Sequence, residues 1–499
     1  MRIVLIYPDY PKADLGGCYY EGIASLSSCL KQEGHEILFY HVTNSLSAEI
    51  LIKSVEKVKP DCVAFSSSSP MAEYVEEWAP AIKNCTDALT VWGGVHCRMF
   101  PENAIESRGI DAVCYGEGDL SFPELLRRYE NGADITETDN FLFKREGKLI
   151  WNKLKFVDNL EDLPDPDREI FNFSNLYEYT KPGRYRFTSF MFARGCPYNC
   201  DYCGNHRIKR DYIDQESFVR TISPERAIRR IKNHLILHPE TDYVRIEDSN
   251  INLKTGWFNE FIEIYKEEIK APYYCQTRPE LVTEDFVKTL KETNCLFLVI
   301  AVENGNEQFR KKMLNRKMSN QLYKEVFKLC DKYKVIVRTS NMIGLPEETI
   351  ELALETIRFN EQLGSYDASV SVFYSLPGTK IDDYCKSRGY YMNTSEEIMW
   401  TDSTLIQDSI SNKDVLVLHR AWFLCLYLYA FARKNGNENY KLIDDLIISF
   451  LKAIPEDAVN KPFLDNLQQL SAKCLILYQK VKYHSLDQYH PFAQSGMTF

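Results

Sequence analysis

The sequence predicts an α/β protein with an N-terminal doubly wound, Rossmann-like domain, a middle domain built on a parallel sheet and a C-terminal helical region. Two observations carry this prediction. Apolar strand-like runs alternate with helix-like segments in two separate stretches, and the end of the chain shows helical patterns only. We predict domains at 1–140, 186–390 and 391–499, with a linker at 141–185.

The N-terminal stretch reads as alternating strands and helices. Its predicted strands are 3–7, 36–40, 62–66, 89–92 and 112–114, and its predicted helices are 21–33, 48–57, 71–83 and 120–129. A doubly wound sheet binds its ligand beyond the carboxyl ends of its strands. The ligand of this domain is therefore expected there.

Polar and glycine-rich turns stand at those strand ends. They contain Ser66, Ser67, Ser68, Gly93, Gly94, His96, Gly116, Glu117 and Gly118. Glycines let the backbone approach a bulky ligand, and hydroxyls suit phosphate or amide groups. The first strand is not followed by G-x-G-x-x-G, so a nicotinamide or flavin site is disfavoured.

The linker and the middle domain follow. Residues 157–169 combine acids with two prolines, which predicts an extended, solvated connection. Six strands are predicted beyond it, at 187–193, 243–247, 272–276, 296–302, 335–341 and 369–374. The first helix between them begins with Ser223 as N-cap, Pro224 at the first helical position and Glu225 in the first turn.

The C-terminal region contains an apolar, aromatic-rich run at 415–432. A membrane span needs about 20 apolar residues. This run is shorter and includes His419 and Arg420, so we expect a buried helix and no transmembrane segment.

Three cysteines carry most of the functional information. Cys196, Cys200 and Cys203 are spaced C-x3-C-x2-C. Three thiolates on one loop can hold a [4Fe–4S] cluster and leave one iron open, which makes these cysteines the candidate catalytic and metal-binding residues. A Cys3His zinc site that includes His206 is the alternative. A disulfide framework is disfavoured, because the 15 cysteines are scattered and no secretory signal precedes them, which favours a reducing cytoplasm.

With Tyr202 before the third cysteine, this motif resembles the signature of the radical S-adenosylmethionine (SAM) superfamily. The resemblance implies a partial (β/α)6 barrel whose open iron is chelated by SAM. It also implies reductive cleavage of SAM to methionine and a 5'-deoxyadenosyl radical. The implied SAM-binding residues follow the cysteines and successive strands: Tyr202, Glu247, Asp248, Arg278, Glu303, Asn341, Ile343 and Gly344.

The resemblance also gives these positions separate roles. The loop with Glu247 and Asp248 would meet the methionine amino group, Glu303 the ribose or amino group, and the 343–346 turn the adenine. The chain departs from the family after the second strand, where Glu-Asp-Ser-Asn stands in place of the more usual glycine-rich segment. The contact there is therefore open.

The N-terminal turns resemble those of the cobalamin-binding domain that precedes the barrel in class B radical SAM enzymes. The implied cobalamin contacts are Tyr7 and the nine residues of the polar and glycine-rich turns. D-x-H-x-x-G is absent, so cobalamin is expected base-off with no histidine on cobalt. A second cluster, as in methylthiotransferases, is disfavoured because most N-terminal cysteines lie within predicted strands or helices.

The net charge and the family resemblance together indicate which functions are expected and which are disfavoured. A net charge of −11, from 71 acids and 60 Lys and Arg, argues against nucleic acid as a partner. The resemblance implies a cytoplasmic methyltransferase that moves a methyl group from methylcobalamin to an unactivated carbon of a small metabolite or natural-product intermediate. The implied electron source is an external one-electron reductant such as flavodoxin or ferredoxin. A non-methylating rearrangement, cyclisation or oxidation, and a cobalamin or iron–sulfur carrier or sensor, are the alternatives.

Overall fold

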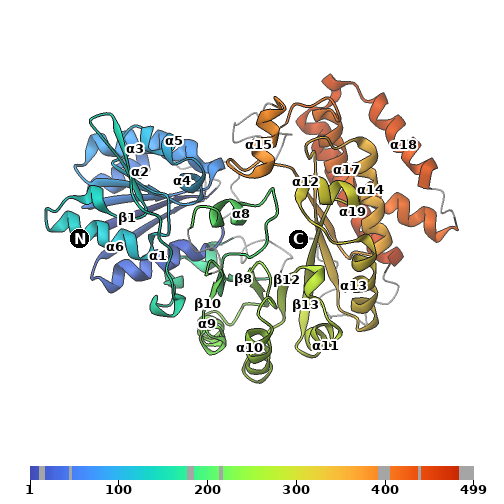
Figure 1. Cartoon of the computed structure of the whole chain (residues 1–499), viewed down its shortest axis with the longest axis horizontal. Coiled ribbons are helices and arrows are strands. Elements are labelled where there is room, and N and C mark those ends of the chain that lie inside the picture. Colours follow the sequence, from blue (N-terminus) through green and yellow to red (C-terminus); the bar gives the residue numbers. More distant parts are fainter. Residues whose placement is uncertain are drawn as a thin grey trace. The chain divides into compact units, whose positions relative to one another are not determined.

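The computed structural model describes residues 1–9, 17–43, 48–176, 185–212, 217–390, 405–436 and 440–482. The chain divides into two compact units (Figure 1). One contains Met1–Pro197 and Ile208–Asp242, and the other contains Tyr198–Arg207 and Tyr243–Phe499.

A seven-stranded sheet in the order β2-β1-β3-β4-β5-β6-β7 forms the centre of the N-terminal domain. Its strands are β1 Arg2–Pro8, β2 Glu36–Val42, β3 Cys62–Ser66, β4 Leu89–Gly93, β5 Ala112–Cys114, β6 Phe141–Arg145 and β7 Lys148–Trp151. The first five are parallel, as the alternation of strands and helices predicts. The doubly wound topology is therefore confirmed.

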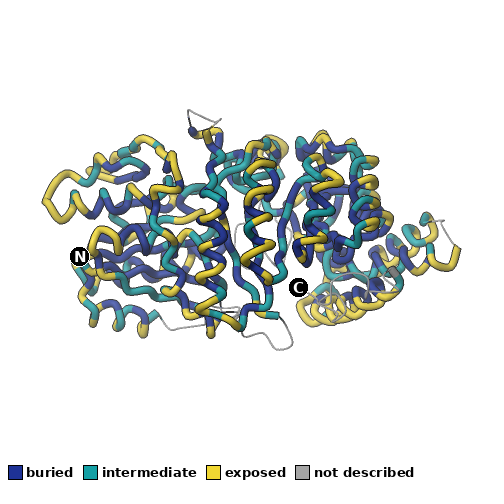
Figure 2. The backbone as a smooth tube through the Cα atoms, turned by 90° about the horizontal axis from the view of Figure 1, so that it is seen from below, coloured by how far each residue is buried: buried dark blue, intermediate teal, exposed yellow. Residues whose placement is uncertain are grey.

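Helices cover both faces of this sheet: α1 Glu21–Gln32, α2 Ala48–Val58, α3 Ala72–Cys85, α4 Val95–Met99, α5 Pro101–Glu106 and α6 Gly118–Glu130. Successive side chains of a strand point to opposite faces. Val4 and Ile6 thus share a core with α2 and α3, whereas Ile3 and Leu5 share one with α6. Figure 2 shows buried residues along the strands and exposed ones on the outer sides of the helices.

The β6–β7 hairpin lies in the segment predicted as a linker. It extends the sheet by two antiparallel strands. Its turn is formed by Glu146 and Gly147, which have φ values of 51° and 75°. A two-residue turn with positive φ at both positions suits a tight hairpin. The Glu-Gly pair between two apolar runs is the signal that the sequence analysis missed.

Three acids after this hairpin pair with groups of the fold, although most acids of the segment are exposed, as the prediction of a solvated connection expects. The buried guanidinium of Arg226 donates to Asp165 Oδ1 at 2.7 Å and to the carbonyl of Glu161 at 2.9 Å. Asp167 accepts from Ser27 Oγ and from Lys31 Nζ, each at 2.6 Å. These side chains anchor the segment, which contains short 3-10 turns.

A second sheet of six strands has the order β15-β14-β13-β12-β11-β8, so neighbours in space follow the order of the chain. Its strands are β8 Phe187–Phe190, β11 Tyr243–Ile246, β12 Tyr273–Thr277, β13 Cys295–Glu303, β14 Val337–Ile343 and β15 Ala368–Val372. The pairs from β11 to β15 are parallel. The six strands predicted for the middle domain are thus confirmed.

Helices lie between these strands or follow the last one: α8 Gly204–Lys209, α9 Pro224–Leu237, α10 Thr255–Glu268, α11 Glu284–Glu292, α12 Glu307–Leu314, α13 Asn320–Lys332, α14 Ile350–Leu363 and, after β15, α15 Lys380–Ser387. A two-stranded antiparallel ribbon, β9 Ala193–Arg194 with β10 Arg220–Thr221, precedes α9. The predicted cap of α9 is confirmed, because Ser223 Oγ accepts from the N–H of Arg226 at 3.3 Å.

The C-terminal region is helical, with α17 Asn412–Lys434, α18 Tyr440–Ala453 and α19 Lys461–Lys482. Of the described helices, α17 alone has the length and hydropathy of a membrane span, and 61% of its most apolar window is buried in the protein. Its Trp422 donates to the carbonyl of Ala368 on β15 at 2.7 Å. This burial is that of a core helix.

Candidate functional site

The cysteine loop begins directly after β9, between the two strands of the β9–β10 ribbon. Gly195 precedes Cys196 with φ 89°, and a Cβ at this glycine would lie 2.4 Å from the carbonyl oxygen of Phe218. Only glycine fits such a close backbone approach. Cys200 is buried, and α8 begins immediately after Cys203. No three metal-ligand side chains converge among the described residues, so the cluster ligand set stays a prediction from spacing.

Two arginines lie beside Cys200. Arg278 Nη1 donates to the Cys200 Sγ at 3.3 Å, and its guanidinium lies 3.8 Å from the centre of the Tyr198 ring. Arg316 is 4% exposed, and its Nη1 lies 4.0 Å from the same sulfur. Both guanidinium groups therefore place positive charge beside this sulfur. Arg278 was predicted from the sequence. Arg316 was not, because nothing in its local pattern sets it apart.

Tyr202 and Glu303 meet at the end of β13. The Tyr202 hydroxyl donates to Glu303 Oε1 at 2.7 Å; Glu303 is buried and Tyr202 is partly buried. Burial raises the pKa of the Glu303 carboxyl, although Arg316 and the Tyr202 hydroxyl partly oppose the shift. Glu303 has φ 67°, a left-handed conformation that is strained for a residue with a side chain. Such strain often marks functional positions.

The loop after β11 contains the other two predicted acids. Glu247 is half-buried and pairs with Arg245 Nη2 at 2.7 Å, and its carbonyl accepts from Gln276 at 3.1 Å. Asp248 is 4% exposed. A carboxylate this deeply buried is uncommon in a solvated loop.

The end of β14 contains a polar network. Asn341 donates to the carbonyl of Ser369 at 2.9 Å and accepts from Asn360 at 2.7 Å, so both ends of its amide have protein partners. Ile343 is fully buried, and Gly344 has φ 81°. The assignment of these residues to SAM stays a prediction.

Glu348, which the sequence analysis missed, joins two of the predicted SAM-binding segments. It is fully buried and accepts from the N–H groups of Gly344 at 2.6 Å and Leu345 at 3.2 Å. It also accepts from the side chain of Asn304 at 2.8 Å. Burial raises the pKa of its carboxyl to about 8, although these three donors favour the charged form.

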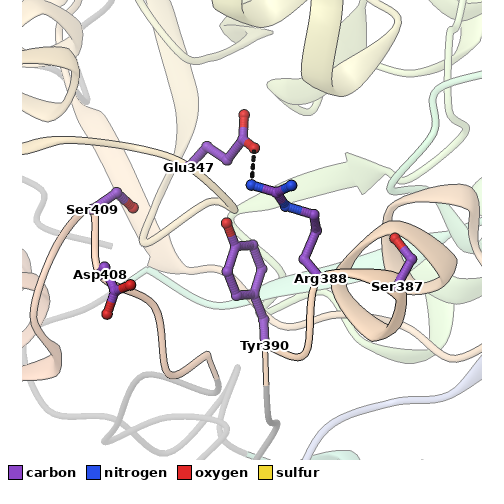
Figure 3. Close-up of a pocket in the computed structure, with 6 residues that line it drawn as sticks. All are labelled: Glu347, Ser387, Arg388, Tyr390, Asp408 and Ser409. Atoms are coloured by element: carbon purple, nitrogen blue, oxygen red, sulfur yellow. Dashed lines mark ion pairs between the residues drawn. The ribbon is translucent and has the colours of Figure 1, made fainter.

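A polar cavity of 560 Å³ lies next to this turn (Figure 3). It is lined by Glu347, Ser387, Arg388, Tyr390, Asp408 and Ser409. Glu347 has φ 61° and faces Arg388 at 3.5 Å, while its N–H donates to Gln407 at 2.8 Å. These contacts hold the chain directly after the 343–346 turn.

The predicted turns of the N-terminal domain lie side by side at the strand ends. The N–H of His96 donates to the carbonyl of Ser67 at 3.0 Å, and Trp92 Nε1 donates to Ser67 Oγ at 3.0 Å. Gly94 has φ 94°, and a Cβ there would lie 2.6 Å from the Ser67 carbonyl oxygen. The Ser-rich and Gly-Gly turns therefore form one cradle.

Two buried polar side chains of this cradle lack protein partners. Ser68 Oγ and both ring nitrogens of His96 make no hydrogen bond. The imidazole lies between Trp92 and Phe100, at ring-centre distances of 4.9 and 5.2 Å. Burial lowers the pKa of His96 to about 4, so the ring is neutral at neutral pH. Buried polar atoms are normally satisfied, and these point to a missing polar ligand.

Tyr7 is buried at the end of β1, with its ring centre 4.5 Å from that of Tyr20. Two residues on, the buried Asp9 accepts from the N–H of Cys18 at 2.7 Å and contacts His41 Nε2 at 2.8 Å.

The 116–119 turn has a different environment. A Cβ at Gly116 would lie 2.3 Å from Asn140 Oδ1, and Gly118 begins α6. The Glu117 carboxylate is bound by Arg220 at 2.7 Å. This carboxylate faces protein groups, and its role as a cobalamin contact stays a prediction.

Comparison with known proteins identifies two domains in this order. Residues 16–126 match the B12 binding domain, and residues 190–359 match the Radical SAM superfamily. The chain belongs to the radical SAM enzymes that carry a B12-binding domain. The two matches contain the cradle and the cysteine loop, respectively.

Two relatives and one solved structure show what this chain is similar to. It is 24% identical over 414 residues to the uncharacterized methyltransferase PH0819 of Pyrococcus horikoshii, covering 82% of this chain and 87% of the relative. It is 27% identical over 384 residues to the anaerobic magnesium-protoporphyrin IX monomethyl ester cyclase of Cereibacter sphaeroides, covering 72% and 59%. Its fold matches the radical SAM methyltransferase TsrM of Kitasatospora setae, solved with cobalamin and a [4Fe–4S] cluster, with TM-score 0.62, 14% identity and coverage of 78% and 75%.

The residues of this radical SAM enzyme fit the cofactors of its family. In the N-terminal domain, the unsatisfied Ser68 hydroxyl and His96 imidazole suit the amide and phosphate groups of cobalamin, and Gly94 permits close approach. Near Cys200, the guanidinium groups of Arg278 and Arg316 suit a thiolate-bound cluster and the carboxylate of SAM. [4Fe–4S], SAM and cobalamin are therefore the cofactors of this enzyme.

Proposed function

We propose that this enzyme transfers a methyl group from methylcobalamin to an unactivated carbon of a small metabolite or natural-product intermediate. The observation that carries the proposal is that one chain combines two sites. The cradle of the B12-binding domain contains buried polar atoms without protein hydrogen-bond partners, and the radical SAM domain contains the three-cysteine motif. A methyl donor and a radical generator together suit a carbon that has no acidic proton. The relatives named as methyltransferases support this choice.

When bound, the cluster and SAM supply a 5'-deoxyadenosyl radical, and cobalamin supplies the methyl group. The protein binds and orients these groups. In the proposal, Cys196, Cys200 and Cys203 hold the cluster. Arg278 stabilises the sulfur charge at Cys200 through its 3.3 Å hydrogen bond. The buried Tyr202–Glu303 pair fixes a carboxylate for the amino or hydroxyl groups of SAM.

In the proposal, the remaining predicted SAM-binding residues also bind SAM. Glu247 and Asp248 follow β11, Asn341 and Ile343 lie at the end of β14, and Gly344 follows that strand. The turn is shaped by Glu348, which binds its backbone N–H groups.

The proposal includes base-off cobalamin with no histidine on cobalt. All three histidines of the N-terminal domain have other surroundings. His35 Nδ1 contacts the chain's amino group at 3.3 Å, His41 Nε2 contacts Asp9, and His96 stacks between two aromatic rings. The absorption spectrum of the bound cobalamin tests this point, because coordination by a histidine would shift its bands.

The decisive experiment does not require a known substrate, because an extract that contains candidate substrates can be used. The anaerobically reconstituted enzyme is incubated with cobalamin, a strong reductant and SAM carrying a deuterated methyl group. Methyl transfer is expected to form S-adenosylhomocysteine and 5'-deoxyadenosine in equal amounts, and a product heavier by the labelled methyl. Two electrons per turnover enter from the reductant, for which a flavodoxin or ferredoxin in the cytoplasm is the proposed physiological source.

The second candidate function is a non-methylating oxidation or cyclisation, which the similarity to the cyclase favours. That chemistry forms 5'-deoxyadenosine without S-adenosylhomocysteine, and its product gains no labelled methyl. This outcome would contradict methyl transfer and leave the radical SAM assignment intact. If wild type forms no 5'-deoxyadenosine, the proposal of any radical reaction fails.

A further inference from the structure

Glu117 is held by a two-pronged ion pair. Arg220 Nη1 and Nη2 donate to the two carboxylate oxygens of Glu117 at 2.9 and 2.7 Å. The same guanidinium donates to the carbonyl of Val157 at 2.5 Å, and the N–H of Val157 donates to Glu117 at 2.7 Å. A bidentate arginine–carboxylate pair of this kind fixes the relative orientation of the two side chains in addition to neutralising their charges. Arg220 is buried, so the pair is largely removed from water.

Asp119, two residues on, makes the same arrangement with a second arginine. Arg194 Nη1 and Nη2 donate to the two oxygens of Asp119 at 2.7 and 2.9 Å, and Ser25 Oγ donates to Asp119 at 2.5 Å. Burial alone raises the pKa of the Asp119 carboxyl, but the charge and hydrogen bonds of Arg194 outweigh it and leave the pKa lowered. Asp119 is therefore a buried, paired carboxylate.

The two arginines face each other in the ribbon that leads into the cysteine loop. Arg194 of β9 pairs with Arg220 of β10 in antiparallel register. Arg194 is followed by Gly195 and Cys196, and Gly195 packs against the backbone of Phe218 without room for a side chain. The position of Cys196 is thus tied to that of Arg194 by the one residue between them, Gly195, whose backbone is constrained.

We propose that Glu117 and Asp119 are positioning residues for the cluster-bearing loop, which they hold through Arg220 and Arg194. The 116–119 turn of the B12-binding domain then takes part in assembling the iron–sulfur site, with or without cobalamin bound. This inference rests on the proposed role of Cys196 as a cluster ligand and not on methyl transfer.

The test uses the full chain with Asp119→Asn and, separately, Glu117→Gln. Each protein is reconstituted anaerobically with limiting iron and sulfide and without cobalamin or substrate. We expect about tenfold less cluster than in wild type, because removing a group that orients a metal ligand typically lowers metal affinity by about tenfold or more. Iron content, the electron paramagnetic resonance signal of the reduced cluster and 5'-deoxyadenosine formation are the readouts. The cobalamin affinity of Asp119→Asn, measured by absorbance, is expected to stay within about twofold of that of wild type.

Two further variants make the test specific. Glu124→Gln removes an exposed carboxylate of the same helix α6, whose partners are Arg127 and Arg128, and is expected to load cluster as wild type does. Arg194→Lys keeps the positive charge but cannot form the bidentate hydrogen bonds to Asp119. We expect intermediate loading from it, and it remains informative if a carboxylate variant fails to fold by circular dichroism.

Full cluster loading with a wild-type signal in all these variants would overturn the inference. So would a loss of cobalamin affinity with normal cluster loading, since Glu117 would then act as a cobalamin contact. If wild type itself holds no cluster, the proposed function falls together with the inference. Normal loading in wild type and in the Asp119 and Glu117 variants removes the inference alone.

Discussion

The carboxyl group of Glu348 is fully buried and accepts a hydrogen bond from the backbone N–H of Gly344 at 2.6 Å. Its second oxygen accepts from Asn304, the neighbour of Glu303, at 2.8 Å. One side chain therefore links the ends of β13 and β14, which are two of the segments proposed to bind SAM. Its role is to set the distance between them.

Replacing Glu348 by Gln should weaken SAM binding more than it slows SAM cleavage. The amide nitrogen of Gln cannot accept the N–H of Gly344 or the amide of Asn304, so one of the two ties is lost. We expect about tenfold weaker binding, the equivalent of roughly 1.4 kcal/mol. Equilibrium dialysis with SAM gives the affinity, and 5'-deoxyadenosine formation at saturating SAM gives the rate. Glu351→Gln, on the first turn of α14, is the matched control.

The same residue predicts a pH dependence of stability. The pKa of Glu348 is about 8 in the folded protein, above its usual value, so its neutral form is favoured by folding. Its contribution is fully present below the unfolded pKa and declines as pH rises toward 8. The unfolding temperature of wild type, relative to Glu348→Gln, should fall between pH 5.5 and 8.5. A constant difference would contradict the prediction.

His96 predicts the opposite trend at lower pH. Its pKa of about 4 lies below the usual 6.5, so folding favours the neutral imidazole. Its contribution to stability is present above pH 6.5 and declines as pH falls toward 4, by up to about 3 kcal/mol. In His96→Phe the decline should be smaller, as denaturant unfolding of the apoprotein at pH 7 and pH 4.5 would show.

His96→Phe should also weaken cobalamin binding, since the ring nitrogens without protein partners are lost while the stack with Trp92 and Phe100 is kept. A lost hydrogen bond in a buried site predicts about a tenfold effect. Cobalamin titration followed by absorbance measures it. His238→Phe, outside the cradle, is the control, and an unchanged affinity would remove His96 from the site.

Arg278→Lys should lower the reduction potential of the cluster. The guanidinium donates to the Cys200 sulfur, and hydrogen bonds to cluster sulfurs stabilise the reduced, more negative state. Lysine keeps the charge but loses the planar fork and the stack on Tyr198. A redox titration monitored by electron paramagnetic resonance gives the potential. The exposed Arg229→Lys should match wild type, and equal potentials in both variants would refute the prediction.

Cys200→Ala should abolish the cluster, with 5'-deoxyadenosine falling to background. The loop offers three cysteine ligands, and the two thiolates that would remain hold a four-iron cluster poorly. Iron analysis and the absorbance of the reconstituted protein are the measurements. Cys85→Ala, in α3, should retain a full cluster, and retention of the cluster by Cys200→Ala would refute the ligand assignment.

Local patterns made the fold predictable. Buried parallel strands such as β1 and β13 are continuous apolar runs, and the capping residue Ser223 marks the start of α9. The β6–β7 hairpin was missed because its segment lies beside a proline-rich, acidic stretch that masks the short turn. Arg316, Glu348 and the partners of Glu117 were missed because their importance lies in contacts with residues distant in the chain.

By itself, the sequence determined the order of domains and the cysteine motif, because strand periodicity and ligand spacing are local properties of a chain. Tertiary structure alone decided which charged side chains are buried and paired. Glu117 was predicted as a member of a ligand-binding turn, yet Glu117 and Asp119 bind arginines 75 or more residues away. A carboxylate has no fixed partner until folding removes it from water, and only the folded chain brings that partner within hydrogen-bonding distance.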